Sequence, residues 1–309
     1  MAHRPKNPLI PTRQGVSPSC VAIPHRKPMP WASVFDFLCE RLPVVPPEGW
    51  AQRLAAGDVL GDDGQALSAA TACEPGTRLY YYRQLDDEAE IPFEECIVFQ
   101  DEHLLVADKP PFMPVTPGGR YVRHSLMVRL KQRTGIDTLN PIHRIDRETA
   151  GLVVFNIRPQ DRNAYHALFR ERAVDKRYEA IAPNQPELRW PITRRSRIEE
   201  DVEAFFRMVE AEGEPNSETR IDLLEVNGRW ARYALEPVTG KRHQLRVHLQ
   251  ALGAPIAGDQ FYPVVRRGPD EAEDFQEPLR LLARAIAFTD PVTGQARRFE
   301  SGQRLQWPD

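Results

Sequence analysis

The sequence has 309 residues, of which 41 % are apolar and 28 % are charged, and its formal net charge is −3. This length accommodates one large domain and a small one, and the apolar fraction is ordinary for a globular protein with a full core. The slightly negative charge excludes indiscriminate binding to polyanions, so any nucleic-acid partner has to meet a local basic surface.

Residues 1–30 are rich in proline and in basic side chains and show little periodicity, so we expect an extended or mobile arm. This segment lacks the apolar core of a signal peptide, and no apolar run in the chain approaches the ~20 residues that cross a bilayer. We therefore expect a cytoplasmic protein without a membrane partner. The four cysteines are widely spaced and form no metal-ligand pattern, which favours reduced thiols over disulfides or a metal site.

Residues 31–85 are expected to form a small module of two helices followed by a hairpin. Ser33 and Asp36 have the spacing of a capping box, and Trp50 faces inward from a second helix. Short strands follow on both sides of a Gly-Asp-Asp-Gly turn. This order resembles the RNA-binding module shared by a ribosomal protein of the small subunit and many RNA-modifying enzymes. Such modules usually carry several cations on the second helix, which here offers mainly Arg53, so we expect a degenerate module.

The acidic stretch at 86–90 is predicted to link this module to a larger domain at residues 91–309. Strands and helices are mixed there without strict alternation, which predicts an α+β domain. The strands are expected at 97–99, 104–106, 152–155 and 178–181, and the helices at 125–134, 161–172 and 243–252.

The most informative segment runs from Pro141 to Phe155, where polar residues lie between an apolar lead-in and a buried strand. Asp146 precedes that strand, with Arg144 and Arg147 beside it. An acid at the start of a buried strand, close to guanidinium groups, can be held ionised in a cleft of low dielectric and can act as a nucleophile or a base. A charged turn whose Asp and Arg pair at the surface explains the same residues. The segment alone leaves both interpretations open.

The run His143-Arg144-Ile145-Asp146, followed two residues later by Thr149-Ala150-Gly151-Leu152, resembles the signature of the RluA family of pseudouridine synthases. Ile145 and Ala150 replace the family's usual Leu and Ser. Further elements match the family's pattern in order, within about residues 95–293: Lys109-Pro110, Lys176-Arg177-Tyr178, the run from Thr239 to His248, Gly258-Asp259 with Tyr262, and a late strand at 281–291. Agreement over ordered elements argues strongly against chance.

The resemblance implies the pseudouridine synthase fold, with a mixed and largely antiparallel sheet, and an enzyme that isomerises uridine in RNA to pseudouridine. It assigns Asp146 as the nucleophile or base that breaks the bond between the base nitrogen and the ribose. Tyr178 would lie against the uracil and is a candidate for the proton transfer from carbon five, and Arg246 would pair with Asp146. The uracil would then rotate and rejoin through carbon five, which requires no metal and no cofactor.

The resemblance also places six residues where they would contact the RNA substrate: His143, Arg144, Lys176, Lys241, His243 and Gln244. Arg144 would hold the RNA once the uridine has swung out of the stack. Lys241 replaces a usual Arg, which keeps the charge and loses the bidentate fork. For His143, His243 and His248 we favour hydrogen-bonded structural roles over catalytic ones.

Two expectations concern other charged residues. Glu148 follows Asp146 closely in the sequence and is expected to face solvent. The cluster Arg194, Arg195 and Arg197 is expected to lie in a loop and to bind phosphate, although a solvated surface is the alternative for such a run.

The favoured function is therefore isomerisation of uridines in ribosomal or transfer RNA by a monomeric enzyme. One alternative is an RNA-binding protein that keeps the fold without activity, and the presence of Asp146, Tyr178 and Arg246 argues against it. The other alternative is a glycosidase that depends on a carboxylate. Glycosidases normally use two acids, whereas the signature presents Asp146 and a Glu148 that is expected at the surface.

Overall fold

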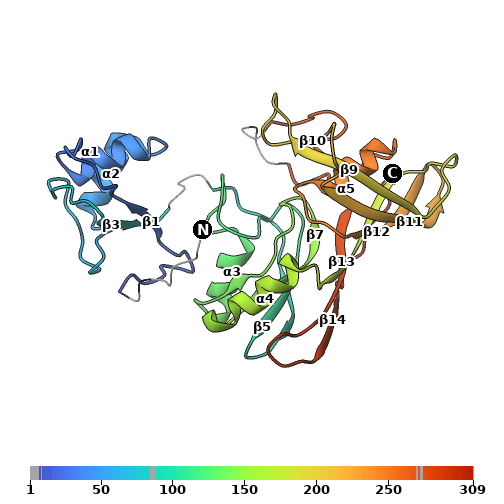
Figure 1. The fold of residues 1–309 in the computed structure, drawn as a ribbon, viewed down its shortest axis with the longest axis horizontal. Coiled ribbons are helices and arrows are strands. Elements are labelled where there is room, and N and C mark those ends of the chain that lie inside the picture. The colour runs from blue at the N-terminus through green and yellow to red at the C-terminus, as the bar shows by residue number, and fades with distance from the viewer. Residues whose placement is uncertain (1–6, 8, 84–87, 269–270, 272–273, 309) are drawn as a thin grey trace. The chain divides into compact units, whose positions relative to one another are not determined.

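The structure, a computed structural model, divides the chain into two compact units, residues 1–88 and 89–309 (Figure 1). It describes residues 7, 9–83, 88–268, 271 and 274–308. The predicted acidic linker at 86–90 therefore falls partly outside the described residues. Within the described ranges, no helix combines the length and the apolar character needed to span a bilayer. All four cysteines are free thiols.

The first unit contains two helices and a three-stranded antiparallel sheet of order β1-β3-β2. Its elements are β1 (Ser19–Ala22), α1 (Val34–Arg41), α2 (Pro47–Ala55), β2 (Val59–Leu60) and β3 (Arg78–Tyr81). The predicted capping box is confirmed, because the amide of Asp36 donates to the Ser33 hydroxyl at 3.2 Å and the amide of Ser33 donates to the Asp36 carboxylate at 3.1 Å. Trp50 is fully buried, as predicted, and its ring packs edge-on against Tyr81 at 5.3 Å.

The prediction that residues 1–30 form an extended or mobile arm is wrong for the stretch from Ile10 to Ile23. All four residues of β1 pair with β3, and Ile10, Val16 and Ile23 are buried within the first unit. The segment folds because its few apolar side chains complete the core beside β3, which outweighs the extended preference of the surrounding prolines. Residues 1–6 and 8 lie outside the described residues.

The second unit is built on one mixed sheet of eleven strands within the described residues, in the order β10-β9-β11-β12-β8-β13-β7-β5-β4 (Figure 1). Strand β14 pairs with β13, and β6 pairs with β7. The strands are β4 (Cys96–Gln100), β5 (Leu104–Lys109), β6 (Asn140–Pro141), β7 (Ala150–Asn156), β8 (Asp175–Pro183), β9 (Ile192–Glu200), β10 (Met208–Ala211), β11 (Ser217–Asn227), β12 (Trp230–Pro237), β13 (Leu281–Thr289) and β14 (Ala296–Glu300). Among the strand pairs of the described residues, only β13–β7 is parallel, so the predicted mixed, largely antiparallel sheet is confirmed.

The predicted helices of this unit are confirmed to within two residues at each end. They are α3 (Leu126–Thr134), α4 (Arg162–Arg170) and α5 (Gln244–Ala251), with a short 3-10 turn, η1 (Pro159–Asp161), before α4. Helix α3 ends at Gly135, whose φ of 72° is the left-handed conformation that favours glycine at this position. Every residue of β5 and β7 is buried, which is why most of each strand is apolar in the sequence, as at 104–107 and 152–155.

Strand β13 lies between β7 and β8 (Figure 1). Strand β7 contains the end of the signature, and β8 carries Tyr178. At the parallel contact, Gly151 of β7 has a φ of 110°, and a Cβ atom there would lie 2.4 Å from the carbonyl oxygen of Ala283. A side chain does not fit in this space. The glycine of the signature therefore allows β7 and β13 to approach, which brings the end of the signature turn next to Ala283, the residue of β13 that pairs with Tyr178 of β8.

Candidate active site

Asp146 lies in the turn that leads into β7 and lines a cavity of about 270 Å³. The amide of Thr149 donates to the Asp146 carbonyl at 3.2 Å, which closes the turn and leaves the carboxylate beside the cavity. The side chain of Asp146 is 26 % exposed, so a substrate can reach it. Tyr178 of β8 and Arg246 of α5 line the same cavity. The structure therefore brings together the three residues that the sequence assigns to catalysis.

Arg246 is held by a partner that the sequence interpretation did not assign. Its Nε and Nη2 donate to the two carboxylate oxygens of Asp259 at 2.8 and 2.7 Å, and both residues are buried. This leaves Nη1, which lies 3.6 Å from Asp146 Oδ2. Burial lowers the pKa of Arg246, but the charge and hydrogen bonds of Asp259, together with the charges of Asp146 and Glu148, outweigh this effect, so the net shift is upward and the guanidinium stays charged. The sequence did contain Asp259 as part of the Gly-Asp element of the family pattern. That element does not indicate that Asp259 pairs with Arg246.

The prediction that Glu148 faces solvent is wrong, because the residue is only 6 % exposed. Its carboxylate accepts a hydrogen bond from Arg147 Nε at 2.8 Å, and its second oxygen lies 3.8 Å from Arg246 Nη1. Burial alone raises the pKa of Glu148. The charges of Arg147 and Arg246 and the hydrogen bond from Arg147 together outweigh burial, so the net shift is downward and the carboxylate stays ionised. The side chain turns inward because a buried guanidinium supplies the counter-charge there.

Lys109, at the end of β5, supports the signature turn and was not assigned a role from the sequence. Its Nζ is buried and donates to the carbonyl oxygens of Pro110 at 2.9 Å and Arg147 at 3.0 Å. Burial lowers the pKa of Lys109 to about 7, although Glu148 and Asp146 oppose this shift. The ammonium group is thus a positioning group beneath the turn rather than part of the cavity wall.

Tyr178 is fixed by pairing on both sides of β8. Its partner on β12 is Leu235, and its partner on β13 is Ala283. Burial and then the charge of Asp146 raise the pKa of Tyr178, so the side chain is a neutral phenol at neutral pH. A neutral aromatic ring on the wall of the cavity can stack against a flat base.

Three of the predicted RNA-binding residues form hydrogen bonds within the protein. His143 Nε2 accepts from the amide of Val154 at 3.1 Å, and His243 Nδ1 lies 3.0 Å from the Tyr262 hydroxyl. Burial lowers the pKa of His143 to about 3 and that of His243 to about 4, so both rings are neutral. The amide of Gln244 donates to the Thr219 hydroxyl at 2.8 Å and to the Glu218 carbonyl at 2.9 Å, and its oxygen accepts from the Thr239 hydroxyl at 2.7 Å.

The other three predicted RNA-binding residues are cations on the cavity wall. Arg144 and Lys241 are exposed, and Lys176 is half-buried. Burial and then the charge of Arg172 lower the pKa of Lys176. These three side chains, rather than the histidines and Gln244, present the positive charge of the cavity to an incoming ligand.

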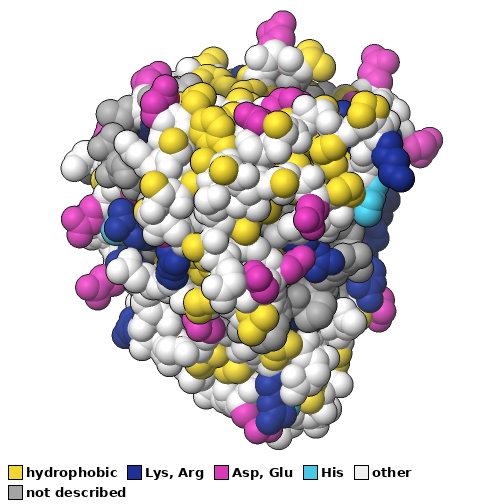
Figure 2. Space-filling model, turned by 90° about the vertical axis from the view of Figure 1, so that its left-hand side faces the viewer, with side chains coloured by type: hydrophobic (Ala, Val, Ile, Leu, Met, Phe, Trp, Pro, Cys, Tyr) yellow, Lys and Arg dark blue, Asp and Glu magenta, His cyan; other side chains and the backbone are white. Residues whose placement is uncertain are grey.

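The prediction that Arg194, Arg195 and Arg197 lie in a phosphate-binding loop is wrong. All three lie on β9, and each is paired with an acid: Arg194 with Glu210, Arg195 with Glu218 at 2.9 Å, and Arg197 with Glu199 at 2.6 Å. Acids on the neighbouring strands β10 and β11 supply the counter-charges for Arg194 and Arg195, and Glu199 of β9 itself supplies that for Arg197. Figure 2 shows the molecule from the left-hand side of Figure 1, and on that face Lys and Arg side chains lie among Asp and Glu side chains.

His248 of α5 provides a test of how acid affects this unit. It is fully buried, with Nδ1 2.9 Å from the Thr219 hydroxyl and Nε2 3.0 Å from the Ser217 hydroxyl. Burial lowers its pKa to about 4, below the value near 6.5 of an unfolded histidine. The unfolded chain therefore takes up a proton first as the pH falls, and the folded state loses stability between about pH 6.5 and pH 4. We expect a loss of about 2 kcal/mol from this residue between about pH 7 and pH 5.

Urea unfolding of wild type and His248→Gln at the two pH values measures this loss. Glutamine keeps polar contacts and does not titrate, so the drop in unfolding free energy should be smaller in the variant by that amount. Equal drops in the two proteins would contradict the prediction.

Comparisons with known proteins agree with this fold and site. A family model described as RNA pseudouridylate synthase matches residues 103–251. The dual-specificity RNA pseudouridine synthase RluA of Haemophilus influenzae is 31 % identical over 225 residues, which cover 66 % of this chain and 91 % of that protein. The ribosomal large subunit pseudouridine synthase C of Vibrio cholerae is 32 % identical over 243 residues, which cover 78 % of this chain and 74 % of that protein.

Among solved structures, human RNA pseudouridylate synthase domain containing 1 superimposes with a TM-score of 0.56 at 23 % identity, over 68 % of this chain and 84 % of that one. The second unit therefore has the fold of a pseudouridine synthase domain. The chain belongs to the RluA-type family of RNA pseudouridine synthases, as the signature around Asp146 indicated.

Proposed function

We propose that this protein isomerises uridines in RNA to pseudouridine and that Asp146 performs the chemistry. The observation that carries the proposal is the arrangement of three side chains around one cavity: an accessible carboxylate, a charged guanidinium 3.6 Å from it, and a neutral phenol ring. Relatives named for this reaction support the same conclusion.

The reaction needs one anionic group and no external reagent. Asp146 either attacks the anomeric carbon of the ribose or removes a ribose proton, and in both routes the bond from base nitrogen to sugar breaks. The uracil then rotates, carbon five bonds to the anomeric carbon, and the proton from carbon five leaves as the base nitrogen regains one. Arg246 keeps Asp146 oriented through Nη1, since its other two nitrogens are committed to Asp259.

The glycosidase alternative loses support from the position of Glu148. A second acid beside Asp146 would have to donate a proton to the leaving group. Glu148 is ionised by two guanidinium groups and is not on the wall of the cavity that Asp146 lines. A free uracil among the products would nevertheless restore this alternative.

Tyr178 is proposed to hold the uracil by stacking, with a smaller contribution from its hydroxyl. Burial and the Asp146 charge raise the pKa of the phenol, so very little phenolate exists to take the proton from carbon five. We expect Tyr178→Phe to lower kcat by no more than about tenfold, whereas Tyr178→Leu loses the stack, worth about 1–3 kcal/mol, and should cost up to about 100-fold. Single-turnover assays on unmodified RNA measure both rates. Equal losses in the two variants would assign the effect to the hydroxyl instead.

The direct test of the function is a pseudouridine map of cellular RNA with and without the gene, followed by treatment of the unmodified RNA with purified protein. We expect specific sites to disappear in the first comparison and to return in the second. RNA that is bound but gains no pseudouridine would favour the alternative of an RNA-binding protein without activity.

The class of RNA follows from the relatives only as a proposal. They are named for the ribosomal large subunit, for transfer RNA or for dual specificity, so we propose ribosomal or transfer RNA as the substrate. The cytoplasmic location, the monomeric state, and the RNA-binding role of the first unit remain predictions from the sequence.

A further inference from the structure

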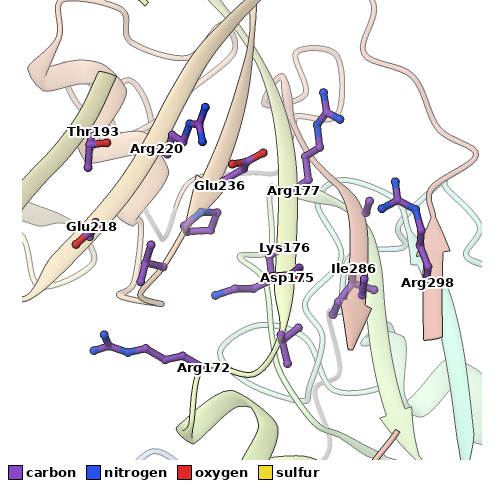
Figure 3. Close-up of a pocket in the computed structure, with 15 residues that line it drawn as sticks. Arg172, Asp175, Lys176, Arg177, Thr193, Glu218, Arg220, Glu236, Ile286 and Arg298 are labelled. Carbon is purple, nitrogen blue, oxygen red and sulfur yellow. The ribbon is translucent and has the colours of Figure 1, made fainter. Parts of the chain in front are cut away.

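A second hollow, of about 580 Å³, opens beside the catalytic cavity (Figure 3). Its walls come from the start of β8 and the residues before it, the end of β12, and parts of β9, β11, β13 and β14. The charged residues that line it are Arg172, Asp175, Lys176, Arg177, Glu218, Arg220, Glu236 and Arg298. We call this hollow the β8–β12 groove.

The groove exists because β12 separates from β8. The two strands pair from Trp230–Pro183 as far as Leu235–Tyr178, and the pairing stops there. Strand β12 continues along β11 to Pro237, while β8 continues along β13. The two strands therefore diverge just beyond Tyr178.

The groove and the catalytic cavity meet at this divergence. Lys176 and Pro237 line both of them. A third hollow, of about 400 Å³, lies between them and is lined by Arg172, Lys176 and Lys241 among others. A chain that occupies the catalytic cavity can therefore continue past Lys176 into the β8–β12 groove without crossing a closed wall.

The groove extends to the side of the sheet opposite α5. Thr219 of β11 contacts Gln244 and His248 of α5, so its neighbours Glu218 and Arg220 face the other side. Figure 3 shows Arg220 on this strand. Arg172 and Lys176 extend from the opposite wall toward the strand that carries Glu218 and Arg220.

Three arginines of the groove are available to an anion. Arg172, Arg177 and Arg220 are exposed, and the part of the chain that the structure describes shows no ion pair for any of them. Arg298 is paired with Glu300, and the acid Glu218 is already held by Arg195 at 2.9 Å. Asp175 and Glu236 remain as acidic groups on the wall.

We propose that the β8–β12 groove binds the phosphates of the RNA strand next to the target uridine, chiefly through Arg172 and Arg220. This proposal rests on the proposed function, since it takes the catalytic cavity as the place of the uridine. A single-stranded segment fits best, because consecutive phosphates can follow a narrow, bent path that a duplex cannot enter. Phosphate contacts of this kind position the substrate and do not read its sequence.

The test is the salt dependence of binding of the full-length protein to a fluorescent oligouridylate of about 12 nucleotides, measured by anisotropy. Each phosphate contact on a single strand contributes about 0.7 to the slope of log affinity against log salt. We expect Arg172→Ala/Arg220→Ala to weaken binding at low salt by about tenfold or more and to reduce the slope by about 1.4. Arg172→Lys/Arg220→Lys keeps the two positive charges and should recover most of the affinity at low salt and most of the slope.

Arg189→Ala is the matched control, since Arg189 is exposed on the same unit and lines none of these hollows. It should change neither affinity nor slope. If the double alanine variant does not fold, Thr193→Glu places a negative charge at an exposed position of the groove and should weaken binding in the same way. A slope equal to wild type in the folded variants overturns the proposal.

Pseudouridine formation in cellular RNA separates this failure from a failure of the proposed function. A wild-type protein that makes pseudouridine, with groove variants that bind and modify RNA normally, overturns the groove alone. A wild-type protein that makes no pseudouridine, with groove variants that still lose affinity and slope, overturns the function and leaves the groove as an RNA-binding site.

Discussion

Replacing Asp146 by asparagine is expected to lower the rate of pseudouridine formation by at least about 10³-fold. The substitution keeps the size of the side chain and removes its charge. An amide neither attacks the anomeric carbon nor takes a ribose proton at neutral pH, so both proposed routes stop at the same step. Binding of RNA should change little, because the phosphate contacts come from other side chains. Single-turnover conversion and anisotropy on the same RNA measure the two effects separately.

Glu187→Gln is a matched control for the loss of one carboxylate. Glu187 is exposed on the same unit and is not among the residues that line the catalytic cavity. Its rate should equal that of wild type. Turnover within tenfold of wild type in Asp146→Asn would refute the role of Asp146 and with it the proposed chemistry.

The second large effect is expected from the buried pair of Arg246 and Asp259. Asp259→Ala leaves a fully buried guanidinium without the two hydrogen bonds that hold it. Removing one partner of a buried ion pair costs about 3–5 kcal/mol, so the unfolding free energy should fall by about that amount. Activity should fall as well, because Arg246 is then free to turn away from Asp146. Urea unfolding and single-turnover rates give the two values.

A double variant separates stability from catalysis. Arg246→Met/Asp259→Leu removes both charges and fills a similar volume, and such exchanges are often neutral for stability. We expect the double variant to be much more stable than Asp259→Ala and to remain as inactive. Glu148 complicates the exchange, since it also loses Arg246, but it keeps its hydrogen bond from Arg147 at 2.8 Å. A double variant with wild-type activity would show that Arg246 does not support Asp146.

The sequence predicted local structure well where the signal is local. The capping box at Ser33, the end of α3 at Gly135 and the buried strand β7 depend on neighbours along the chain, and all were correct. The family pattern also identified the three residues that line one cavity. Periodicity and motif spacing carry this kind of information because they record which face of an element is buried.

The incorrect predictions share a physical cause, which is a partner distant in the sequence. Glu148 is buried because Arg246, far along the chain, meets it in space. Two of the β9 arginines, Arg194 and Arg195, are neutralised by acids that the sheet register brings alongside. β1 joins the first sheet through β3, many residues later. A charge or an apolar side chain in the sequence does not reveal which distant residue will satisfy it.

The central place of β13 has a consequence for how the catalytic cavity forms during folding. This strand joins the part of the sheet that contains β7 to the part that contains β8, yet it follows both of them in the chain. Asp146 precedes β7 and Tyr178 lies on β8, so the two residues reach one cavity only when β13 has inserted between the two parts. Because such long-range pairing has to close a long loop first, we expect the cavity to be completed late in folding.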